Sequence, residues 1–190
     1  MATYSKLFYD YELIPTVSEK DSREATLLAT VQSLLGTGKP RNHGVCFFEM
    51  KGQDMQHPDS ASWYDDLEAT ELYLMVLSLY CRGVTSDQIG LLTPYAKQAK
   101  TLRGMFMDTD IVMPKVDSIE KFQGQERDIM RISTVRSTGD HISHKRIILA
   151  IARARAFLVI YGNPHLLSVD DNWRHLINHS FISKWNTNKY

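Results

Sequence analysis

The stretch "IGLLTPYAKQAKTLRGMF", Ile89 to Phe106, passes directly from a buried strand into a helix. Its first residues form a short apolar run, which is typical of a strand covered on both faces. Pro94 follows at once, and proline is favoured in the first turn of a helix. The stretch therefore predicts a strand over 88–93 and a helix over 94–106.

The same alternation recurs on both sides of this stretch. Other short apolar or β-branched runs closed by turn residues predict strands over 45–50, 128–135 and 157–162. Apolar residues at helical spacing predict helices over 22–35, 65–81, 144–155 and 170–180. Strands that alternate with helices of roughly 10–15 residues indicate an α/β fold, with a mostly parallel sheet and helices on both faces. The polar, turn-rich segment 51–64 is predicted to be a surface loop.

Size and composition limit the classes of protein to which this chain can belong. The chain has 190 residues, 43% of them hydrophobic, which suits one domain with a sizeable core. Lys and Arg number 22, as do Asp and Glu, so no strong basic charge marks a stand-alone nucleic-acid binder. The two cysteines have no metal-type spacing, and His175 and His179 lack the partners of a zinc site, so no metal site is predicted. No apolar run approaches the roughly 18 residues of a membrane span.

A segment near the start, "SLLGTGKPRN" (33–42), raises the question of a phosphate-binding loop. That loop reads G-x-x-x-x-G-K-[ST], in which the last hydroxyl ligates Mg²⁺. With Gly38 and Lys39 as the G-K pair, the first glycine position holds Ser33 and the hydroxyl position holds Pro40. The segment is therefore predicted to be the end of the helix over 22–35, with Gly36 as its C-terminal stop.

Three segments are expected to carry the chemistry, because ligands in such folds gather at loops after the C-terminal ends of strands. In "IGLLTPYAKQ", Thr93, Pro94 and Tyr95 form a strand-to-helix junction that suits an anion such as a phosphate. In "VDSIEKFQGQERDIM", Gly124 permits close backbone approach. The neighbouring side chains Gln123, Gln125 and Glu126 can bond ribose hydroxyls or orient a water. The alternative for this second segment is a polar loop with a glycine turn.

The third segment, "KRIILAIARARAFLVIYGNP", places Arg146, Arg153 and Arg155 in an otherwise apolar helix that leads into a buried strand. Arginine there is costly unless it meets a fixed anion. One such anion is the γ-phosphate of a nucleotide on a neighbouring domain, with arginine acting as a finger. The alternative is a helix-surface arginine beside an acidic patch.

Together the three segments resemble motifs IV, V and VI of the second RecA-like domain of superfamily 1 RNA helicases of the up-frameshift type. The resemblance is closest to the Armitage-like subgroup, which includes the Moloney-leukaemia-virus-ten-like helicases of RNA silencing. It extends to "SKLFYDYELIP", "KGQDMQHPDSASWYDDLEAT" and "NPHLLSVDDNWRHLI", and so covers nearly the whole chain. It implies one RecA-like domain over 1–182. An entry segment takes up 1–64, a motif-bearing core 65–182, and a tail 183–190.

The resemblance also implies a division of labour with a first RecA-like domain outside this chain. That domain would supply the phosphate loop and the Mg²⁺-binding acid, and ATP would lie between the two domains. Arg153 would be the arginine finger and act in catalysis with Gln123, while Gly124, Glu126 and Arg146 would face the nucleotide, Glu126 at the ribose. Five residues would line the path of single-stranded RNA: Thr93, Pro94, Tyr95, Asp117 and Ser118. The expected activity is ATP-driven 5′ to 3′ movement on RNA, with the isolated chain inactive.

Other implied properties are partners among Argonaute and Piwi-pathway proteins, no membrane association, and a place in the cytoplasm and RNA granules. Three departures from the family pattern keep other functions open. Ile148 replaces an asparagine, Ala152 replaces a hydroxyl residue, and only eight residues, "TGDHISHK", lie between Ser137 at the end of motif V and Arg146 in motif VI. These favour a non-catalytic, decayed or truncated helicase domain that serves as an RNA or protein interaction module. A third hypothesis is a DNA helicase of the same superfamily.

Overall fold

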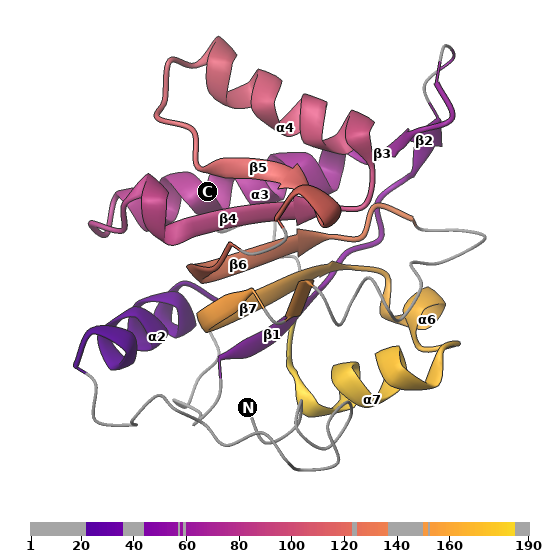
Figure 1. The fold of residues 1–190 in the computed structure, drawn as a ribbon. Helices are drawn as coiled ribbons and strands as arrows, with labels where there is room; N and C mark the ends of the chain where they lie inside the picture. Colours follow the sequence, from indigo (N-terminus) through magenta and orange to yellow (C-terminus); the bar gives the residue numbers. More distant parts are fainter. Residues whose placement is uncertain are drawn as a thin grey trace.

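The computed structural model describes residues 22–35, 44–56, 58, 60–122, 125–136, 150–151 and 153–184. Its centre is a six-stranded sheet in the order β5-β4-β6-β7-β1-β8, and every neighbouring pair of strands is parallel (Figure 1). The strands are β1 (Val45–Glu49), β4 (Ile89–Thr93), β5 (Lys115–Ser118), β6 (Arg127–Ser133), β7 (Ala154–Gly162) and β8 (Phe181–Lys184). A separate antiparallel pair is formed by β2 (Met55–Gln56) and β3 (Trp63–Tyr64).

Helices cover both faces of the sheet (Figure 1). Side chains from three helices pack on one face: α2 (Ser22–Leu35), α3 (Asp66–Tyr80) and α4 (Ala96–Asp108). The other face is covered by η2 (Glu120–Phe122), α6 (Pro164–Leu167) and α7 (Asp171–His179). A further short turn, η1 (Ser86–Gln88), leads into β4. The predicted α/β, RecA-like fold class is confirmed.

The strands are apolar on both sides because each side meets its own layer of helices. In β7, Phe157, Val159 and Tyr161 belong to the core beneath α3, whereas Leu158 and Ile160 belong to the core beneath α7. Such continuous burial is the reason that these strands read as unbroken apolar runs and not as alternating ones.

Three sequence expectations about elements are wrong at their edges. The helix predicted through Arg155 ends earlier, because Ala154 already pairs with Arg127 as the first residue of β7. The predicted tail starts too early, because Ser183 and Lys184 pair with Phe48 and Glu49 at the end of β8. The predicted loop over 51–64 contains the β2–β3 pair. In the first two cases pairing between segments far apart in sequence decided the outcome, and local pattern does not report such pairing. The third is a short local pair between Met55–Gln56 and Trp63–Tyr64.

Several sequence predictions lie outside the described residues. They concern the loop after α2 with Gly36 and Lys39, and five motif residues: Gln123, Gly124, Arg146, Ile148 and Ala152. None of the described helices is long and apolar enough to cross a membrane.

The start of β1 requires a glycine. A Cβ at Gly44 would lie 2.0 Å from the carbonyl oxygen of Ala156, and the Gly44 carbonyl accepts a 2.6 Å hydrogen bond from the Leu158 N–H. Both partners are backbone atoms, so an added methyl group must separate β1 from β7. We expect Gly44→Ala to lower the free energy of unfolding by about 2 kcal/mol or more, measured from urea unfolding by circular dichroism.

Gly104 provides the matched control, because it lies inside α4 and a Cβ there would meet nothing within 4 Å. Gly104→Ala should raise the free energy of unfolding by about 0.5–1 kcal/mol through better helix propensity. Equal urea midpoints for the two variants would contradict this account of β1.

Candidate functional site

The candidate residues divide between two opposite edges of the sheet. We call the edge at which β4, β5 and β6 end the C-terminal edge, and the edge at which they begin the N-terminal edge. Thr93 and Ser118 end β4 and β5, whereas Glu126 and Arg153 immediately precede β6 and β7. The expectation that all three motif segments follow the C-terminal ends of strands is therefore wrong for Glu126 and Arg153. The chain between β5 and β6 must return to the other edge because the two strands are parallel.

At the N-terminal edge, strand pairing brings Glu126 and Arg153 together. The Arg127 N–H donates to the Arg153 carbonyl at 3.0 Å, and the Arg153 N–H donates to the Ala150 carbonyl at 3.2 Å. The Glu126 carboxylate pairs with the Arg155 guanidinium at 3.1 Å. Both side chains of that pair are about half-exposed, so it contributes little stability and remains open to a competing ligand.

Cationic side chains gather at this edge. Lys115 donates to the Gln125 side-chain oxygen at 2.5 Å, and its ammonium lies 5.1 Å from the centre of the Phe122 ring. The Arg127 guanidinium lies 5.9 Å from the same ring. With Arg153 and Arg155 added, the starts of β5, β6 and β7 carry four cations, beside the carboxylates of Glu126 and Asp128. Such a cluster suits a polyanionic ligand such as a nucleotide phosphate chain.

At the C-terminal edge, Thr93 is fully buried and its hydroxyl accepts the Tyr95 N–H at 3.4 Å. This bond shapes the turn into α4, while Pro94 and Tyr95 remain half-buried at the surface. On the neighbouring strand, Asp117 pairs with Arg103 at 3.0 Å. Of the junction residues, Pro94 and Tyr95 are thus the ones whose side chains can meet a ligand.

A network of buried polar groups lies directly beneath this edge. The Ser133 hydroxyl donates to Glu68 Oε2 at 2.6 Å, and the Val135 N–H donates to the same oxygen at 2.9 Å. The Gln98 amide donates to the Ser133 hydroxyl and to the Asp65 carbonyl, each at 3.1 Å, and its oxygen accepts the Asp65 N–H at 3.0 Å. The network joins α3, α4 and the end of β6.

Burial perturbs both acids in this network. Burial, followed by the nearby charge of Asp65, raises the pKa of Glu68 to about 8, although hydrogen bonds from Ser133 and Val135 oppose the shift. Burial also raises the pKa of Asp65 to about 6, against the hydrogen bond from the Glu68 N–H. Glu68 is therefore largely protonated at neutral pH.

The chain beyond β6 connects this network to the β2–β3 pair. The Arg136 guanidinium pairs with Asp54 at 2.9 Å and lies 4.0 Å from the centre of the Trp63 ring. Nearby, the Lys97 N–H donates to the Ser62 hydroxyl at 3.0 Å, and the Lys97 ammonium lies 5.4 Å from the centre of the Tyr64 ring. The pair β2–β3 accordingly lies beside the start of α4 (Figure 1).

Sequence reasoning missed the network and these contacts. The pattern Asp65-x-x-Glu68 is typical of a helix start, and Asp65 does accept the Glu68 N–H as an N-cap. The Glu68 side chain, however, points across to β6 and not back to the cap. Arg136, Asp54 and Trp63 carry no recognisable spacing, because three separate segments supply them.

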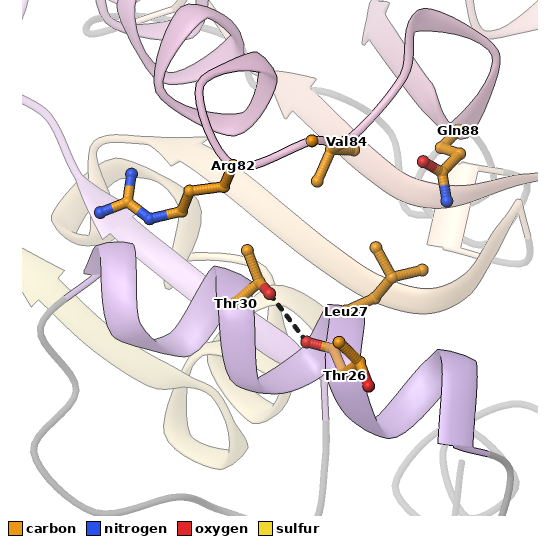
Figure 2. Close-up of a pocket in the computed structure, with 7 residues that line it drawn as sticks. Thr26, Leu27, Thr30, Arg82, Val84 and Gln88 are labelled. Carbon is orange, nitrogen blue, oxygen red and sulfur yellow. Dashed lines mark hydrogen bonds between the residues drawn. The ribbon is translucent and has the colours of Figure 1, made fainter.

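A cavity of about 350 Å³ lies between α2 and the turn that follows α3 (Figure 2). Its lining comes from α2 and from the turn between α3 and β4: Thr26, Leu27, Thr30, Arg82, Gly83, Val84 and Gln88. The Thr30 hydroxyl donates within α2 to the Thr26 carbonyl, and the Gln88 amide donates to Asp128. The cavity contains none of the predicted site residues.

A nucleotide with Mg²⁺ fits the described residues in part. The cations at the N-terminal edge suit phosphates, but nowhere in the described ranges do three or more His, Cys, Asp or Glu side chains cluster as metal ligands.

Comparisons with known proteins agree with the resemblance. A family model described as an AAA domain matches residues 1–165. The chain is 50% identical to a Drosophila melanogaster protein named probable RNA helicase armi, over 93% of this chain and 16% of that protein. It is 34% identical to mouse RNA helicase Mov10l1, over 95% of this chain and 16% of the relative. It is 32% identical to chicken putative helicase MOV-10, over 91% and 20%. The chain thus spans about a sixth to a fifth of these relatives.

Proposed function

This chain belongs to the AAA domain family of up-frameshift-type helicases, as their C-terminal RecA-like domain, and we propose that it is the C-terminal half of an ATP-dependent RNA helicase of the Armitage type. It would complete, from one side, an ATP site whose phosphate loop lies on a first RecA-like domain. The observation that carries the proposal is the meeting of Glu126 and Arg153 at the start of β6 and β7.

In this proposal each residue at the N-terminal edge has a task. Arg153 stabilises the charge that develops on the transferred phosphoryl group, as an arginine finger does. Glu126 accepts hydrogen bonds from the ribose hydroxyls once Arg155 releases it. Gln123 acts with Arg153, and Gly124 and Arg146 face the nucleotide; these three roles rest on the motif resemblance alone.

The C-terminal edge would meet the RNA. Pro94 and Tyr95 stand at the surface, and α4 begins directly after them. The positive end of its dipole favours a phosphate, although the Lys97 N–H already donates to the Ser62 hydroxyl. Thr93 would act through its backbone and by shaping the turn, with Asp117 and Ser118 alongside. Because ATP and RNA then contact opposite edges of one rigid sheet, closure of the inter-domain cleft would move the RNA edge. The direction of movement, 5′ to 3′, comes from the family.

Partners of the Argonaute and Piwi pathways, single-stranded RNA, and a cytoplasmic or granule location belong to the same proposal. All three derive from the resemblance. The alternative, a non-catalytic interaction module, rests on the departures at Ile148 and Ala152. The names of the relatives favour RNA over DNA.

The test is an ATPase assay in two formats. The purified chain alone should hydrolyse no ATP, with or without single-stranded RNA. Joined to an intact first RecA-like domain from a relative, it should show ATPase activity that single-stranded RNA stimulates and single-stranded DNA does not. Absence of RNA-stimulated turnover in the joined protein would favour the interaction module. ATP turnover by the chain alone would overturn the proposal that it supplies only one side of the ATP site.

A further inference from the structure

The end of β6 holds a strained turn. Val135 is fully buried and has a φ of 66°, in the left-handed region that β-branched residues avoid. The Arg136 N–H donates across it to the Thr134 carbonyl at 2.7 Å, which closes a γ-turn of the rare type with positive φ. Backbone strain of this kind persists only where surrounding contacts enforce it, and it concentrates at functional sites.

Glu68 supplies the enforcing contact. Its Oε2 accepts the Val135 N–H and the Ser133 hydroxyl together, so one carboxyl oxygen holds both sides of Thr134. The Thr134 N–H donates in turn to the Tyr161 carbonyl of β7 at 3.1 Å. The turn is therefore held from α3 on one side and from the sheet on the other.

Gln98 connects this turn to the candidate RNA junction. It lies in the first turn of α4, three residues after Tyr95, and its side chain bonds to the Ser133 hydroxyl and to the backbone of Asp65. The Ala99 N–H, next to it, donates to the Tyr95 carbonyl at 3.1 Å. A displacement of Gln98 would thus move both Tyr95 and the end of β6.

The turn also directs Arg136. By reversing the chain after β6, it carries the Arg136 guanidinium to Asp54 and to the Trp63 ring, where both charged side chains are largely buried. The β2–β3 pair is thereby attached to the same unit.

We infer that Glu68 and Gln98 are positioning residues, which join the turn at Val135 and the first turn of α4 into one rigid unit that presents the C-terminal edge to RNA. Neither touches a ligand; both act through the residues they hold. The part of this inference that concerns RNA rests on the proposed function, whereas the part that concerns the rigid unit does not.

The first experiment tests the rigid unit on the chain itself, by hydrogen exchange resolved to single amides. Gln98→Met keeps the side-chain volume and removes the hydrogen bonds. The amides of Val135 and Ala99 should both exchange about tenfold faster or more, while the amide of Arg127 at the other edge should keep its rate. If the Val135 and Ala99 amides keep their wild-type rates, or only one of them changes, the rigid unit is wrong.

The second experiment tests the RNA half in the protein joined to a first RecA-like domain. Gln98→Met and Glu68→Ala should each raise about tenfold the RNA concentration that half-saturates ATPase stimulation, with the KM for ATP unchanged. The control is Leu79→Ala, a buried truncation near the far end of α3. It should lower the active fraction without shifting either constant.

The outcomes are distinguishable. Equal shifts in the RNA and ATP constants, or the same shift in Leu79→Ala, would show that Glu68 and Gln98 affect only the stability of the whole domain. Either result would overturn the inference. If the wild-type joined protein lacks RNA-stimulated ATPase, the proposed function fails, and the exchange experiment still decides the rigid unit.

Discussion

Replacing Arg153 by alanine is expected to lower the RNA-stimulated ATPase rate of the joined two-domain protein by about a thousandfold, with little change in the KM for ATP. An arginine finger acts on charge that develops only in the transition state, so its loss reduces kcat and not ground-state binding. A thousandfold loss corresponds to about 4 kcal/mol of transition-state stabilisation. Steady-state phosphate release at saturating RNA measures it.

Two variants make this result specific. Arg153→Lys keeps the charge but lacks the planar fork of donors, and should remain at least about a hundredfold impaired. Arg174→Ala removes an exposed arginine of α7 that bonds to Asp171 and to the Ser168 carbonyl, and it should leave the rate unchanged. A kcat within about threefold of wild type for Arg153→Ala would remove Arg153 from the catalytic step.

The second large effect concerns stability and pH. The folded-state pKa of Glu68, about 8, lies above its ordinary value of 4.5. The folded state therefore holds this proton more tightly than the unfolded state does. The resulting stabilisation is complete below about pH 4.5 and is lost as pH rises to about 8. Between pH 5.5 and 8.5, Glu68 alone should lower the free energy of unfolding by about 3 kcal/mol.

Glu68→Gln tests this directly, because an amide oxygen can accept the same two hydrogen bonds but does not titrate. The difference between wild type and variant, from urea unfolding at several pH values, should change by about 3 kcal/mol across that range, with the variant the more stable at pH 8.5. Asp65, whose pKa rises from 3.8 to about 6, should add in both proteins a smaller total loss of stability as the pH rises from about 4 to about 6. Parallel pH curves for the two proteins would show that Glu68 is not protonated when folded.

Much of the fold could be predicted because local signals agreed with tertiary demands. The boundaries of α2 match the predicted range, and those of β1, β4 and α3 lie close to it, since apolar runs, Pro94 and the Asp65 cap act within a few residues. The end of the helix before β7 and the existence of β8 could not be read in this way. Both depend on partners in β6 and β1 that lie far away in the chain.

The candidate site divides along the same line. Each motif residue could be identified from the sequence. Glu126 and Arg153 do lie together, because β6 pairs with β7. The edge that they occupy was mispredicted, because it depends on the return of the chain from β5 to β6. Glu68 was hidden by its position in a helix cap, although its side chain serves another strand.

The sequence by itself determined most of the strands and helices, though not β8 or the β2–β3 pair, and it determined which residues carry motif chemistry, because periodicity, caps and turn residues act locally. Only the tertiary structure decided that the nucleotide-facing and RNA-facing candidates lie at opposite edges. It alone also decided that a buried carboxyl from α3 holds a strained turn after β6. The first follows from the parallel pairing of distant strands, and the second from the packing of α3 against β6. Both bring together groups that no spacing in the chain connects.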